Sequence, residues 1–174
     1  MAFRAIFFDR DGIVNRRMAG DYIRSAGEFE LLPGIAQGLA DLHAKGFRAV
    51  VITNQRGIAL GLMSHADLAA VHERMQDELR SATGHVFDAI YYCPHDHADN
   101  CACRKPKPGM ILQAGNDLDI DLARSWMIGD TESDIEAGLA AGCRTLLVAP
   151  ESTRTKAEIL APTLTVAIER MLQS

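Results

Sequence analysis

The sequence lacks any long hydrophobic run, and this absence excludes several classes of protein. A helix that crosses a bilayer takes about 20 consecutive apolar residues, and no stretch of the 174 residues approaches that length. The first apolar run, 5–8, ends at Asp9, so it is too short to be the core of a secretory signal peptide. We therefore expect a cytoplasmic protein that has no membrane partner.

Positive charge and aromatic residues are also scarce. The net charge is −5 and aromatic residues make up 6% of the sequence, whereas proteins that bind nucleic acids generally present a basic surface and aromatic rings on which bases stack. One small basic run, 104–107, keeps open the alternative of a zinc-stapled module that binds nucleic acid. A phosphatase that acts on nucleic-acid ends is a further alternative, which would use the acidic motifs described below. We nevertheless expect no nucleic-acid partner.

No repeat, low-complexity segment or linker interrupts the sequence, and its length suits one domain over 1–174. Apolar runs that predict buried strands fall at 5–8, 48–53, 86–92, 125–129 and 144–148, and helical patterns lie between them and over 165–172. Strands that alternate with helices pair in parallel through right-handed crossovers. We therefore expect a monomer with a single doubly wound, Rossmann-like α/β sheet, helices on both faces and no large cap domain.

Polar side chains follow three of the expected strands directly. They are Asp9, Asp11, Thr53, Asn54, Asp130 and Asp134. Because the carboxyl ends of parallel strands meet at one edge of a sheet, these residues should share a crevice. Several carboxylates together suit Mg²⁺, which also binds substrate phosphate, and Arg104 and Lys105 would supply cations for that phosphate. The pattern predicts phosphoryl transfer.

Three of the four cysteines cluster near two histidines. Without a secretion signal, such clustering favours a metal site over disulfides. Three thiolates and one imidazole form a complete tetrahedral set for structural Zn²⁺, and the expected ligands are Cys93, His95, Cys101 and Cys103. His97 is the alternative to His95. This zinc loop, defined as residues 93–108, would aim Arg104 and Lys105 into the crevice.

Four short motifs, in their order along the chain, resemble those of the haloacid dehalogenase superfamily of phosphohydrolases. The motifs are Asp9-Arg10-Asp11-Gly12, Thr53-Asn54-Gln55, Lys105, and Gly129-Asp130 with Asp134. More narrowly, Cys93-Pro94-His95 with Cys101-Ala102-Cys103-Arg104-Lys105-Pro106 is similar to the zinc loop of the branch that contains heptose bisphosphate phosphatases and histidinol phosphatases. The resemblance covers most of the chain, from about residue 5 to residue 148.

The resemblance implies a role for each matching residue. Asp9 would be the nucleophile that forms an aspartyl-phosphate, and Asp11 the general acid and base. Mg²⁺ would be held by Asp9, the backbone carbonyl of Asp11, and Asp130, with Asp134 behind them. The phosphoryl group and the rest of the substrate would be held by Thr53, Asn54, Gln55, Arg56, Arg104 and Lys105. Arg56 is equally compatible with a solvated loop arginine.

The implied reaction is removal of the 7-phosphate from D-glycero-D-manno-heptose 1,7-bisphosphate, a small phosphorylated sugar on the route to the lipopolysaccharide core. The run Arg104-Lys105-Pro106-Lys107-Pro108-Gly109-Met110 favours this substrate, whereas the short interval between His95 and Cys101 also suits the alternative, histidinol phosphate. The anomer is left open. Ile13 stands where Thr is frequent in the superfamily, which removes a hydroxyl group. The remaining histidines, His43, His65, His72 and His85, are interpreted as packed or solvated residues without a role.

Overall fold

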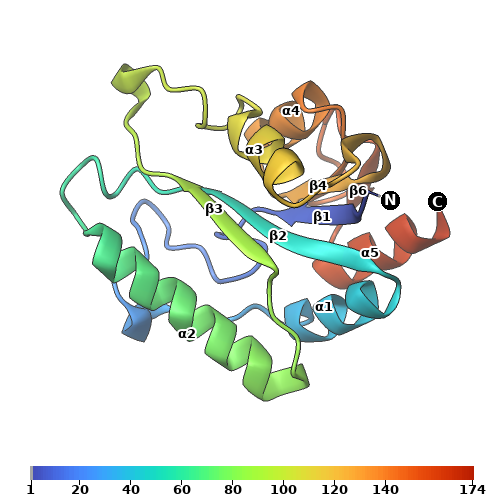
Figure 1. Ribbon diagram of the computed structural model, residues 1–174, viewed down its shortest axis with the longest axis horizontal. Coiled ribbons are helices and arrows are strands. Elements are labelled where there is room, and N and C mark those ends of the chain that lie inside the picture. Colours follow the sequence, from blue (N-terminus) through green and yellow to red (C-terminus); the bar gives the residue numbers. More distant parts are fainter. Residues whose placement is uncertain (1) are drawn as a thin grey trace.

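The computed structural model describes residues 2–174, and it contains one six-stranded parallel sheet with the order β3-β2-β1-β4-β5-β6 (Figure 1). The strands are β1 (Arg4–Phe8), β2 (Phe47–Asn54), β3 (Ala89–Cys93), β4 (Trp126–Gly129), β5 (Arg144–Val148) and β6 (Ile159–Ala161). After β3 the chain crosses from that edge of the sheet to pair β4 with the other side of β1. The carboxyl end of β1 therefore lies at the point where the strand order reverses, which is where doubly wound sheets bind ligands.

Helices cover both faces of the sheet. Figure 1 shows α1 (Ile35–Ala44), α2 (His65–Thr83) and α5 (Leu164–Gln173) on one face, and α3 (Gly109–Asp117) and α4 (Glu132–Ala140) on the other. Side chains of a strand alternate between the two faces. Ile6 and Phe8 of β1 accordingly pack in the core of the first face, and Ala5 and Phe7 in the core of the second. The predicted doubly wound fold is confirmed.

The local signals in the sequence place most element ends correctly. Ser64 caps α2 through a reciprocal capping box with Asp67, and Gly84 ends this helix with φ 78°. The strand expected over 86–92 covers Ala89–Cys93 instead, and before it the backbone N–H of Phe87 donates to the side chain of Gln76 on α2. β6 is missing from the prediction, since its apolar run of three residues is too short to indicate a strand. No helix within residues 2–174 is both long and apolar enough to cross a membrane.

Helix α4 approaches the sheet closely at Gly138, because this residue has no side chain. A Cβ atom there would lie 2.6 Å from Cβ of Met127 on β4 and 2.8 Å from Cγ2 of Thr145 on β5. Both neighbours belong to the sheet, so neither can move aside easily. The approach matters for the site because the first turn of α4 carries Asp134.

We predict that Gly138→Ala destabilises the protein by about 1–3 kcal/mol, the usual cost of overpacking a core, although alanine favours helix more than glycine does. For a chain of this size the melting temperature should fall by about 2–4 °C per kcal/mol. Gly27→Ala is the matched control, because the nearest atom to its new Cβ would be 3.9 Å away. A Gly138→Ala protein that melts at or above the wild-type temperature would contradict the prediction.

Candidate active site

The carboxyl end of β1 carries two aspartates into a tight turn. The backbone N–H of Asp9 donates to the carbonyl of Ile128 on β4, with N and O 2.9 Å apart, so Asp9 is fixed beside the neighbouring strand. Gly12 follows with φ 99°, a conformation that side chains disfavour. A Cβ atom at Gly12 would also lie 2.1 Å from Oδ2 of Asp130. Glycine at this position therefore lets the chain turn and leaves space for Asp130.

Lys105 is buried between two carboxylates. Its Nζ lies 2.8 Å from Oδ1 of Asp9 and 2.6 Å from Oδ1 of Asp134, and it also donates to the carbonyl of Ile52 at 2.8 Å. Burial alone would lower the pKa of Lys105, but the two carboxylates raise it above its ordinary value. Burial raises the pKa of Asp9 to about 7, against the lowering effect of Lys105. Lys105 is thus a charged donor held against Asp9.

The backbone of Lys105 and the side chain of Asp134 are both held in place. Asn54, at the end of β2, donates to the carbonyl of Lys105 and accepts from its N–H, each at 3.1 Å. The hydroxyl of Thr131 donates to Oδ2 of Asp134 at 2.7 Å in the capping box that begins α4. Gly129 makes room for this carboxylate, because a Cβ there would lie 2.3 Å from Oδ2 of Asp134.

Three oxygens converge on one point beside Asp9, and the guanidinium of Arg17 marks it. Nη2 of Arg17 lies 2.9 Å from the backbone oxygen of Asp11, 2.7 Å from Oδ1 of Asp130 and 3.7 Å from Oδ2 of Asp9. Carboxylate oxygens of Asp9, Asp130 and Asp134 also lie within 4.8 Å of one another. Hard oxygen donors in this arrangement fit a cation such as Mg²⁺. Sequence reasoning missed Arg17, which lies in an aperiodic loop.

Asp11 has a different environment. Nη2 of Arg10 lies 2.9 and 3.1 Å from its two carboxylate oxygens, and the amides of Asn15 and Gln55 donate to them at 3.0 and 2.8 Å. Burial alone would raise the pKa of Asp11, but Arg10 and these amides together lower it below its ordinary value. Asp9 and Asp11 therefore differ in acidity although only one residue separates them.

A cavity of about 440 Å³ opens at this edge of the sheet. Five of the predicted site residues line it, namely Asp9, Asp11, Asn54, Lys105 and Asp134. The loop 13–29, which has no clear periodicity, also contributes Arg17, Met18 and Tyr22 to the lining. Thr53 and Gln55 are fully buried beneath the cavity, where Gln55 donates to Thr53 at 2.9 Å.

The two remaining predicted substrate contacts lie outside the cavity lining. Nε of Arg56 lies 2.6 Å from Oδ1 of Asp96 in an ion pair that joins the loop after β2 to the zinc loop. Nη1 of Arg104 donates to the carbonyl of His95 at 3.4 Å, and Nη2 lies 3.2 Å from Nε2 of His97. Both arginines thus have contacts within the protein at the rim of the site.

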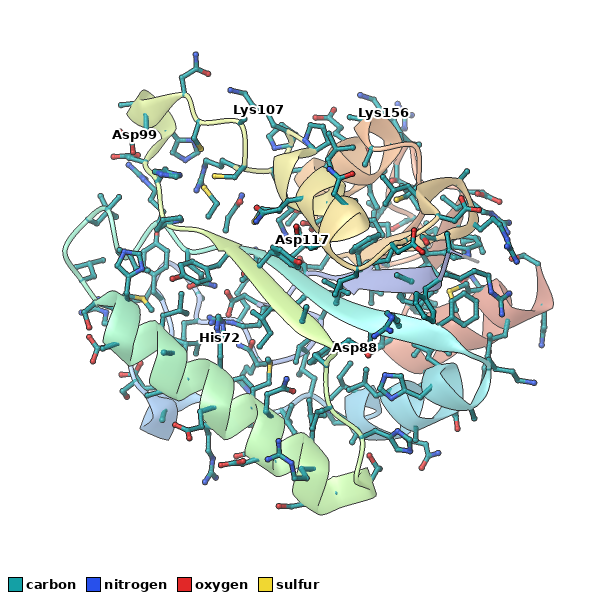
Figure 2. The ribbon with its side chains drawn as sticks, viewed as in Figure 1. His72, Asp88, Asp99, Lys107, Asp117 and Lys156 are labelled. Atoms are coloured by element: carbon teal, nitrogen blue, oxygen red, sulfur yellow. The ribbon has the colours of Figure 1, made fainter. Side chains whose placement is uncertain are left out.

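The cysteine cluster predicted for zinc comes together in the zinc loop. Nδ1 of His95 lies 3.5 Å from Sγ of Cys93 and 3.2 Å from Sγ of Cys103, while Cys101 lies within 3.6 Å of both other sulfurs. Four donors bound tetrahedrally at about 2.0–2.3 Å from Zn²⁺ have similar mutual separations, so the cluster fits this metal. His95 rather than His97 belongs to it. Figure 2 shows the loop standing beside α3, with Asp99 and Lys107 at its surface.

The ammonium group of Lys107 binds other residues of the zinc loop. Its Nζ lies 2.7 Å from Oδ1 of Asn100 and 2.9 Å from the carbonyl of Cys101. The loop is therefore closed by an ammonium group as well as by the cysteine cluster. Lys105, two residues earlier, points instead to Asp9, so the basic run divides between the loop and the cavity.

Comparison with known proteins identifies relatives along most of the chain. A family model described as HAD-hydrolase-like matches residues 102–168. The D-glycero-alpha-D-manno-heptose-1,7-bisphosphate 7-phosphatase of Mycobacterium tuberculosis is 39% identical over 154 residues, which cover 85% of this chain and 80% of that protein. The beta-heptose counterpart of Helicobacter pylori is 44% identical over 138 residues, with coverage of 79% and 78%.

A solved structure agrees with these relatives. The D,D-heptose 1,7-bisphosphate phosphatase of B. bronchiseptica, crystallised with magnesium and phosphate, superposes with a TM-score of 0.86 and 37% identity over 98% of both chains. The chain is therefore a phosphatase that belongs to the haloacid dehalogenase-like hydrolases, in the branch whose curated members are heptose bisphosphate 7-phosphatases.

Proposed function

We propose that this protein is a Mg²⁺-dependent phosphatase that removes the 7-phosphate of D-glycero-D-manno-heptose 1,7-bisphosphate through an aspartyl-phosphate. The observation that carries the mechanism is the contact of 2.8 Å between Asp9 and the buried Lys105 at the cavity. It puts a carboxylate that can attack phosphorus beside a cation that can bind the oxygens of the same phosphoryl group. The relatives with this activity support the choice of substrate.

The reaction runs in two steps that use Asp9 and Asp11. A carboxylate oxygen of Asp9 attacks phosphorus and the bond to the sugar oxygen breaks. The bonding electron pair stays on that oxygen, which takes a proton from Asp11. Water then attacks the phosphorus of the aspartyl-phosphate, gives a proton to Asp11 and releases phosphate from a regenerated Asp9. A phosphoryl dianion beside Asp11 raises its pKa by charge repulsion, which favours the protonated form that the first step needs.

The oxygens around Nη2 of Arg17 provide the cation site in this proposal. Asp9, the carbonyl of Asp11, and Asp130 would hold Mg²⁺, and the contacts of these three oxygens with the guanidinium of Arg17 support this assignment. The ion supplies charge neutralisation and alignment of the phosphoryl group. Asp134 remains paired with Lys105 behind this site.

Zn²⁺ has a structural role in the same proposal. Cys93, His95, Cys101 and Cys103 fill all four positions of a tetrahedral ion, so no open position remains for substrate or water. The ion would hold the segment just before Lys105, and residues 100–104 of this segment form no helix or strand.

The rim arginines would distinguish heptose bisphosphate from histidinol phosphate, the alternative substrate. A bisphosphate presents one phosphoryl group to Asp9 and carries a second anion that needs a cation farther away. Arg104 belongs to the zinc loop, and Arg56 pairs with Asp96 of the same loop. We assign the distal group to Arg104, with Arg56 as the weaker candidate because it is already paired with Asp96. The relatives include enzymes for both anomers of the heptose.

Asp9→Asn should lower the turnover number by more than about 10³-fold, since an amide cannot form an acyl-phosphate. Phosphate release in the presence of Mg²⁺ measures the effect. Asp21→Asn is the control, because Asp21 lines the same cavity but pairs with Arg24 rather than with Lys105. If Asp9→Asn keeps a tenth of the wild-type activity, the aspartyl-phosphate mechanism is wrong.

Elemental analysis should find about one Zn²⁺ per chain, as a set of four protein ligands requires. Cys101→Ala should lose the ion and lower the melting temperature, because metal binding and the order of the loop are coupled. Cys143→Ala removes a buried cysteine outside the cluster and should keep the ion. A metal-free wild-type protein with full activity and unchanged melting would refute the structural role of zinc.

Arg104→Ala should lower kcat/KM for heptose bisphosphate by about 10- to 150-fold, the effect of losing a charge-assisted contact, and should change hydrolysis of p-nitrophenyl phosphate much less. Arg124→Ala is the control, because Arg124 lies just before β4, at the end of the sheet where the strands begin. Wild-type enzyme should also prefer heptose bisphosphate over histidinol phosphate by at least about tenfold for the same reason. Equal or better kcat/KM on histidinol phosphate would replace the proposed substrate with that alternative.

A further inference from the structure

The side chain of Arg10 is completely buried behind the cavity. It extends from the turn after β1 towards α2 and has 0% exposure. Nη2 lies 2.9 and 3.1 Å from the two oxygens of Asp11, and Nε lies 3.3 Å from Oδ1. A buried guanidinium is stable only if its charge and its N–H groups are satisfied. Asp11 accepts hydrogen bonds from Nε and Nη2 of Arg10, whereas Nη1 makes no contact with this carboxylate.

His72 of α2 satisfies the other side. Its Nε2 lies 3.2 Å from Nη1 of Arg10, and the residue is 9% exposed. Burial and the adjacent Arg10 lower the pKa of His72 to about 3, so the ring is neutral and Nε2 can accept the hydrogen bond. Figure 2 shows His72 between α2 and the sheet.

The position of His72 within α2 calls for a polar partner. The neighbouring buried residues of the helix are apolar: Leu68, Val71, Met75 and Leu79. An imidazole among them loses hydration, and an apolar side chain would fill the same space without this cost. The hydrogen bond to Arg10 offsets the lost hydration of both groups. It also fixes the guanidinium plane, because Arg10 is then held from two directions.

We propose that His72 is a positioning residue for Asp11 and acts through Arg10. His72 accepts a hydrogen bond from Nη1 and so fixes the guanidinium plane. Nε and Nη2 then bind the oxygens of Asp11 and orient its carboxyl group at the cavity. The chain of contacts runs from the core side of α2 to the reacting atoms, although His72 touches no substrate. The inference rests on the proposed function, in which Asp11 protonates the leaving oxygen.

The leaving group provides a selective readout of the orientation of Asp11. A sugar oxygen leaves poorly unless Asp11 protonates it as the bond to phosphorus breaks, whereas p-nitrophenolate is stable without a proton. The ratio kcat/KM reports the steps up to transfer of the phosphoryl group to Asp9 and is unaffected by later hydrolysis of the aspartyl-phosphate. Misorientation of Asp11 should therefore lower kcat/KM for a sugar phosphate more than for p-nitrophenyl phosphate.

The test compares His72→Leu with His72→Gln in the full chain with Mg²⁺ bound. His72→Leu removes the acceptor and should lower kcat/KM for heptose bisphosphate by about tenfold or more, but for p-nitrophenyl phosphate by less than about threefold. His72→Gln keeps an acceptor oxygen and should restore the sugar phosphate to within about threefold of wild type. His65→Leu is the matched control, since His65 lies on the same helix and contacts Tyr92 instead of Arg10.

Arg10→Lys gives a second test if His72→Leu folds poorly. Lysine keeps the positive charge but cannot bind both oxygens of Asp11 and His72 at once. The kcat/KM for heptose bisphosphate should therefore fall more than that for p-nitrophenyl phosphate. An unchanged ratio between the two substrates in both variants, with or without lower stability, would overturn the inference. Failure of the proposed function would show separately, as absence of turnover of heptose bisphosphate by the wild type; the comparison then uses any sugar phosphate that the wild type hydrolyses.

Discussion

One buried ammonium group, that of Lys105, determines the geometry of the site. Its three partners are Asp9 after β1, Asp134 in the first turn of α4, and the carbonyl of Ile52 in β2. A charge in this position is tolerated only because all three partners approach closely. The ammonium group therefore cross-links three segments that are far apart in the sequence. Other features of the site support these contacts. Gly129 leaves space for the carboxylate of Asp134, and the amide of Asn54 holds the backbone of Lys105 at the end of its loop.

The sequence allowed the fold and most of the acidic centre to be predicted, for a simple physical reason. In a parallel sheet the residues that follow each strand gather at one edge, so short motifs that are distant in sequence become neighbours. Asp9, Asn54 and Asp134 could be placed in one cavity on this basis, and the structure places them there. The cysteine cluster was predictable as well, because its spacing leaves few alternatives once disulfides are excluded.

Residues whose contacts depend on packing could not be predicted in the same way. Arg17 lies in a loop without periodicity, and nothing in its neighbours indicates that it reaches Asp130 across the cavity. His72 lies on the apolar stripe of α2, where a packed histidine without a role was the simplest interpretation. Its contact with Arg10 joins residues 62 positions apart in the sequence. The rim positions of Arg56 and Arg104 likewise depend on the path of the zinc loop, which no periodic pattern describes.

The separation between the reacting groups and the loop that walls the cavity has an evolutionary consequence. Asp9, Lys105 and Asp134 bind one another at the strand ends and the first turn of α4, whereas loop 13–29 supplies other residues of the cavity lining. Loops tolerate replacement and changes in length far better than the buried strands beneath them. Selection can therefore change which phosphorylated molecule such an enzyme accepts while the groups that break the phosphate ester stay the same.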